Sequence, residues 1–83
     1  MKLPTKQELL LTKIWSETRK LKYNKCVSFE ALGRRFQDDS LMALREKGFV
    51  VLSTDQDGQA GVELKPQYRD LTFAELKEII RKL

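Results

Sequence analysis

The fold of this chain is decided by one stretch, residues 44–64, which reads LREKGFVVLSTDQDGQAGVEL. Gly48 follows a helical turn bearing Arg45 and Lys47, and cations suit the negative end of a helix. Residues 49–52 are all aromatic or branched apolar side chains, typical of a strand with a buried face. Residues 54–61 hold two aspartates, two glycines and no apolar residue larger than alanine, which predicts a turn. The stretch therefore predicts a helix, a glycine exit and a β-hairpin with a polar tip.

Upstream, the pattern predicts a long first helix and a basic connector. Thr5 and Glu8 have the spacing of a capping box, in which each satisfies a free backbone amide of the other. Apolar residues then recur at helical spacing, so we expect a helix from about residue 6 to residue 21. The connector covers residues 22–27, with a short strand around residues 26–27. Its one cysteine, Cys26, is expected to be a small buried residue.

Two further helices are expected between this connector and the hairpin. Ser28 is a good N-cap for a second helix over residues 29–36. An aspartate at position 38 or 39 can cap a third helix that ends at Lys47, with Leu41 and Leu44 buried. This places the two helices directly before the hairpin.

The chain after the hairpin predicts one more helix. Pro66 ends the return strand, because proline cannot donate to an interior ladder. Thr72 and Glu75 form a second capping box, which starts a helix over residues 72–83. Its apolar stripe comprises Phe73, Leu76, Ile79, Ile80 and Leu83. We expect one domain over residues 1–83, with a core region at 5–65 and this terminal helix.

This order of elements resembles the winged helix-turn-helix superfamily over residues 5–65. The stretch from Leu44 to Val50 is similar to the family's helix exit, a leucine, a charged pair, a glycine and an apolar run. The resemblance implies an α+β fold: three helices, a small antiparallel β-hairpin wing and an additional C-terminal helix. It also implies that the third helix enters the DNA major groove. The groove-facing candidates would be Ser40, Ala43, Arg45 and Lys47, with Met42 beside them.

Composition excludes several classes of function. The 83 residues contain one cysteine and no histidine, so disulfides within the chain, histidine triads and the usual zinc sites are not expected. The sequence offers no catalytic constellation and no cofactor motif, so we expect neither an enzyme nor a bound cofactor or metal. No apolar run approaches the roughly 20 residues of a membrane span. We therefore expect a cytoplasmic, intracellular protein without a membrane partner.

Positive charge is concentrated in the first part of the chain. Residues 1–35 carry nine Lys or Arg and three Asp or Glu, a net of +6, whereas residues 36–83 carry seven and nine, a net of −2. A basic face suits DNA phosphates. The candidate phosphate contacts are Lys13, Arg19, Lys20, Lys22, Lys25, Arg34 and Arg35. A solvated lysine-rich surface is an equal alternative.

Two functions remain open at this stage. The first is a small non-enzymatic DNA-binding protein, a transcriptional regulator or accessory factor, held by the basic first half. The second is a protein-interaction module, favoured by Asp55 and Asp57 in a wing without Lys or Arg and by Asp38 and Asp39 at the third helix. A homodimer through Ile79, Ile80 and Leu83 is a further possibility, against simple packing of the last helix on the first.

Overall fold

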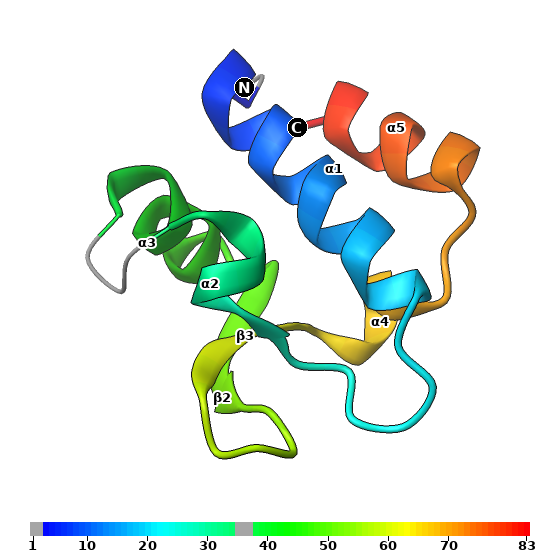
Figure 1. The fold of residues 1–83 in the computed structure, drawn as a ribbon. Helices are drawn as coiled ribbons and strands as arrows, with labels where there is room; N and C mark the ends of the chain where they lie inside the picture. The colour runs from blue at the N-terminus through cyan, green and yellow to red at the C-terminus, as the bar shows by residue number, and fades with distance from the viewer. Residues whose placement is uncertain (1–2, 35–37) are drawn as a thin grey trace.

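The computed structural model describes residues 3–34 and 38–83, and over these residues it is an α+β fold of five helices and one small antiparallel sheet (Figure 1). The elements are α1 (Thr5–Arg19), β1 (Val27–Ser28), α2 (Phe29–Leu32), α3 (Asp39–Glu46), β2 (Val50–Thr54), β3 (Ala60–Leu64), α4 (Pro66–Arg69) and α5 (Phe73–Arg81). The expected order of elements is confirmed up to the hairpin. The short helix α4 was not expected.

The three strands pair in the order β1-β3-β2. The hairpin register places Leu52 opposite Val62, and β1 joins the far side of β3 with Val27 opposite Val62 and Ser28 opposite Gly61. Gly61 is required by this pairing, since a Cβ atom built there would lie 2.2 Å from the Val27 carbonyl oxygen. The short strand lies one residue later than the sequence predicted.

The exit from α3 follows the predicted pattern in detail. Gly48 adopts φ 85, and its N–H donates to the Arg45 carbonyl at 3.1 Å. The Phe49 N–H donates to the Leu44 carbonyl at 3.1 Å, and both of these side chains are buried. This pair of bonds is a Schellman motif, which satisfies free carbonyls at the helix end and turns the chain into β2.

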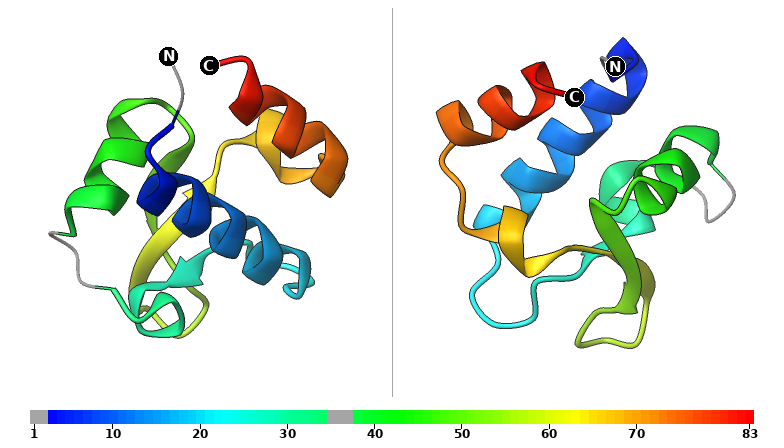
Figure 2. Two further views of the ribbon diagram at one scale, coloured as in Figure 1. Left: turned by 90° about the horizontal axis from the view of Figure 1, so that it is seen from above. Right: turned by 180° about the vertical axis from the view of Figure 1, so that it is seen from behind.

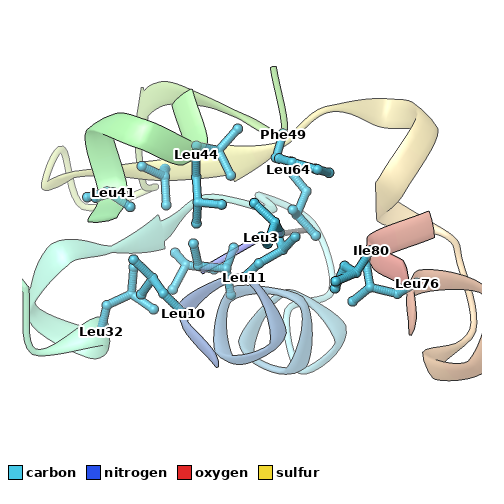
Figure 3. Packing of buried hydrophobic residues seen from close by; sticks show 14 residues of the cluster. Leu3, Leu10, Leu11, Leu32, Leu41, Leu44, Phe49, Leu64, Leu76 and Ile80 are labelled. Atoms are coloured by element: carbon cyan, nitrogen blue, oxygen red, sulfur yellow. The ribbon is translucent and has the colours of Figure 1, made fainter. Parts of the chain in front are cut away.

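The core lies around α1. On one side of α1 lie α3 and the sheet, and on the other side lies α5 (Figures 2 and 3). From α1 it receives Leu10, Leu11 and Ile14, and from α5 Leu76 and Ile80. α5 lies beside α1 (Figure 2). The predicted burial of Leu41 and Leu44 is confirmed.

The N-cap of three helices is confirmed, and that of the first is corrected. Hydroxyl or carboxylate oxygens of Ser28, Asp38 and Thr72 accept the expected backbone N–H groups, and the box between Thr72 and Glu75 is complete. The box between Thr5 and Glu8 is wrong, because α1 begins at Thr5 itself with Pro4 as its N-cap. The Glu8 carboxylate instead pairs with the Lys77 ammonium of α5 at 3.1 Å.

Three predicted helices are also shorter than expected. α2 ends at Leu32, because Gly33 takes the left-handed conformation at φ 64. The last two residues of that predicted helix, 35 and 36, lie outside the described residues. α1 ends at Arg19, two residues before the predicted end, and α5 covers Phe73–Arg81 of the predicted 72–83.

Candidate nucleic-acid interface

The end of α1 and the connector after it carry four of the predicted phosphate contacts. Lys20 is exposed and its ammonium lies 3.3 Å from the Glu17 carboxylate. Lys22 is exposed and forms no ion pair with any residue of the described ranges. Tyr23, next to it, is 88% exposed. This part of the surface therefore presents cations and an aromatic ring directly to solvent.

The other two cations of this group are held by the protein. The Arg19 guanidinium lies 4.9 Å from the centre of the Trp15 ring and donates to the Leu71 carbonyl at 3.2 Å. Trp15 donates to the same carbonyl through its Nε1 at 2.9 Å. The Lys25 ammonium donates to the Leu21 carbonyl. These contacts use one or two donors of each side chain and fix where its charge lies.

The sequence analysis missed Arg69, which lies on α4 close to Arg19 and Lys25. A hollow of about 200 Å³ is lined by Thr18, Arg19, Lys25, Arg69 and Asp70. The Arg69 guanidinium pairs with the Glu63 carboxylate and also approaches the Leu64 carbonyl at 3.4 Å. The available signal was Pro66, which is well suited to the first turn of a helix and here starts α4. The sequence pattern predicted only the end of a strand at this proline.

A second group of cations lies at the end of α2. The Lys13 ammonium donates to the Leu32 carbonyl at 3.2 Å, and the Arg34 guanidinium pairs with the Asp38 carboxylate at 3.0 Å. Burial raises the pKa of Asp38, but the Leu41 backbone N–H and the Arg34 guanidinium lower the pKa by more, so it lies below its usual value. Arg35 lies outside the described residues. Arg34 is thus already neutralised by a carboxylate at the start of α3.

The third-helix candidates are unevenly exposed. Ser40 and Ala43 are half-buried, whereas Arg45 and Lys47 are exposed. Lys47 donates to the Gln7 side-chain oxygen of α1. The exposed part of α3 therefore mixes cations with the carboxylates at its start, and it presents few groups that read base edges.

The tip of the hairpin is acidic and held in one shape. The Asp55 carboxylate accepts the backbone N–H groups of Asp57 at 2.9 Å and Gln59 at 2.8 Å. Gly58 takes φ 81, which closes the turn. From Val50 to Leu64 the hairpin contains three acidic residues and no Lys or Arg. Such a tip repels DNA phosphates.

A second hollow, of about 360 Å³, lies between the connector and this tip. Its lining includes Glu17 and Lys22 on one side and Asp55 and Asp57 on the other. Cys26 also contributes to it but is buried, as expected, and burial raises the pKa of its thiol. A raised pKa favours the protonated thiol over the thiolate.

The predicted dimer residues divide between core and surface. Ile80 is 2% exposed and packs in the core, so its assignment to an interface is wrong. Ile79 is partly buried against the core, and Leu83 is 40% exposed. The amphipathic stripe was broad enough to face either way, and Ile80 belongs to the core cluster. The terminal helix therefore packs inside its own chain.

No helix within the described residues has the length and apolar character needed to cross a membrane. Within the same residues, no group of three or more histidine, cysteine, aspartate or glutamate side chains could hold a metal ion. Comparisons with protein-family models, with curated proteins and with solved structures find no match to this chain.

Proposed function

We propose that this is an intracellular, non-enzymatic DNA-binding protein of winged helix-turn-helix architecture that acts as a transcriptional regulator or accessory factor. The observation that carries this proposal is the gathering of cations at the end of α1. Arg19, Lys20, Lys22 and Lys25 fall within seven consecutive residues, and Arg69 shares a hollow with two of them. Each contact between such a cation and a phosphate releases counterions and so favours binding.

The architecture supports the winged-helix assignment. A helix, a short strand, two helices and a hairpin follow one another, with β1 paired to the far side of the hairpin. The docking that we propose differs from that which the resemblance implied. The end of α1 supplies the main phosphate contacts, and α3 adds only limited base contacts through Arg45 and Lys47. Because the hairpin tip is acidic, it stays away from the DNA backbone.

Removing two of these charges should change the salt dependence of binding. We expect Lys20→Gln/Lys22→Gln to make the slope of log K against log salt shallower by roughly 1.8, two phosphate contacts at about 0.9 each. Both side chains are exposed, so the fold should be retained. Fluorescence anisotropy with a labelled duplex over a salt series measures the slope.

The matched control is Lys6→Gln/Lys82→Gln, which removes the same charge from exposed positions near the two chain ends. Lys6 lies roughly 20 Å from Lys20 along α1, at 1.5 Å per residue. The control should change the slope much less. Equal slopes for both double variants would mean that net charge alone drives binding, and the proposed interface would be wrong.

The acidic hairpin favours a second candidate, a protein-interaction module. A tip fixed by Asp55 and rimmed by exposed Asp57 suits a basic protein surface. Failure of the protein to bind duplex DNA at low salt would favour this candidate. A homodimer through Ile79 and Leu83 also stays a proposal, and the mass of the protein in solution tests it.

A further inference from the structure

We propose that the hollow between the end of α1 and α4 is a binding site for one phosphate group. Its lining has three cations, Arg19, Lys25 and Arg69, and one carboxylate, Asp70. These residues come from a helix end, the connector and a short helix that follows the sheet, so only the fold brings them together (Figure 1). That the phosphate belongs to a DNA backbone rests on the proposed function; a free phosphate is the other source.

The three cations keep hydrogen-bond donors for a ligand. A guanidinium has five N–H donors and an ammonium has three. Arg19 uses Nη1 for the Leu71 carbonyl, and Lys25 uses one donor for the Leu21 carbonyl. Arg69 uses Nη2 for Glu63 and Leu64, which leaves Nη1 without a partner among the contacts of the described residues. The donors left over can form charge-assisted bonds to phosphate oxygens, and two guanidinium groups suit a tetrahedral anion.

The positions of these cations are set before any ligand binds. The Trp15 ring packs against the Arg19 guanidinium, and the Leu71 carbonyl holds both side chains. The Glu63 carboxylate holds Arg69. A fixed donor loses less side-chain entropy on binding than a free surface lysine does. This distinguishes the hollow from the exposed Lys20 and Lys22 beside it.

Charge and size also fit one phosphate. Asp70 is the one carboxylate in the lining and forms no ion pair with a described residue. When Glu63, which pairs with Arg69, is counted as well, the three cations keep an excess of one positive charge. The volume of about 200 Å³ is several times the roughly 30 Å³ of a water molecule. One phosphate group and its bridging waters can therefore enter.

The test has two arms, and both use the full chain. In the first, inorganic phosphate is added to labelled protein and backbone amide shifts are compared with chloride at equal ionic strength. We expect saturable shifts at Thr18, Arg19 and Asp70, which are lost in Arg69→Gln and reduced in Lys25→Gln. Lys22→Gln is the control, because Lys22 carries the same charge in the connector but does not line the hollow.

In the second arm, duplex affinity is measured for the single variants and for two double variants. If Lys25 and Arg69 contact one phosphate, Lys25→Gln/Arg69→Gln should lose less affinity than the product of the single losses. Each single variant should lose up to about eightfold in duplex affinity at 0.1 M salt. One phosphate contact contributes a slope of about 0.9 in log K against log salt, which is about an eightfold change in K between 1 M and 0.1 M salt. Lys22→Gln/Arg69→Gln should be multiplicative, since these residues would meet different phosphates.

The outcomes separate the site from the proposed function. Multiplicative losses for Lys25 and Arg69 together with no phosphate-induced shifts would overturn the phosphate site, even if the duplex binds. Shifts with inorganic phosphate, lost in Arg69→Gln, would support the site even if the duplex does not bind; the proposed function would then fail and free phosphate would be the source. Because Arg69→Gln also removes the partner of Glu63, Lys25→Gln carries the test if that variant does not fold.

Discussion

Leu11→Ala should lower the free energy of unfolding by about 3–4 kcal/mol, within the range of about 2–5 kcal/mol found for buried leucines. Leu11 is fully buried, on the part of α1 that packs between α3, the sheet and α5 (Figure 3). Its truncation removes apolar contacts and leaves a cavity that elements on both sides of α1 must share. Urea unfolding followed by circular dichroism measures the change.

The control lies two residues away on the same helix. Leu9 is 66% exposed, so Leu9→Ala makes the same chemical change without opening a cavity. Its effect should stay within roughly 0.5 kcal/mol, as for most surface substitutions. Similar losses for both variants would show that α1 is rotated from the orientation described, and the placement of every cation on it would then be wrong as well.

Gly61→Ala is expected to destabilise the protein by about 3 kcal/mol or more, at the upper end of what overpacking costs. The new methyl group would lie 2.2 Å from the Val27 carbonyl oxygen and 2.8 Å from the Ser28 Cα. Both are backbone atoms, so neither can rotate away, and β1 would have to leave β3. The thermal midpoint should fall sharply, and amide exchange at Val27 and Ser28 should become fast.

Gly58→Ala separates steric overlap from backbone strain. Gly58 has φ 81 at the hairpin tip, and a Cβ atom added there would meet no atom of the described residues within 4 Å. Alanine there should cost only about 1–2 kcal/mol, the strain of the left-handed conformation. If Gly61→Ala were no more harmful than Gly58→Ala, β1 would not pair with β3 as described.

Helix ends and caps that depend on neighbouring residues were predictable from the sequence. The exit from α3 was correct because a Schellman motif depends on neighbours within six residues, from Leu44 to Phe49. The caps at Ser28, Asp38 and Thr72 were correct for the same reason. Each of these caps is determined by a side chain and a backbone amide three residues away.

Features that depend on distant partners could not be predicted in the same way. The ion pair between Glu8 and Lys77 of α5 joins residues far apart in the sequence and was not predicted. Ile80 was one of three possible dimer residues, but it is buried in the core of its own chain. Arg69 was overlooked because its relation to Arg19 and Lys25 exists only after α4 folds beside the end of α1. The candidate site is therefore largely a product of tertiary packing.

Charge patterning gave the candidate interface only in part. It identified the basic first half, but it could not show that Lys13 and Arg34 lie at the end of α2 while Arg19 and Lys25 line a hollow elsewhere. Nor could it show that Arg34 is paired with Asp38. Net charge in a segment indicates an electrostatic partner, whereas the partners of each side chain decide which charges remain available.

Amide-shift mapping with duplex DNA tests the central claim most directly. A duplex of about 20 base pairs is added to labelled protein at about 50 mM salt, where phosphate contacts are weakened little. We predict the largest shifts at residues 18–25 and 69–70, with the hairpin tip at residues 55–59 unchanged. Shifts concentrated in the hairpin tip and α3, with none at the end of α1, would contradict the account.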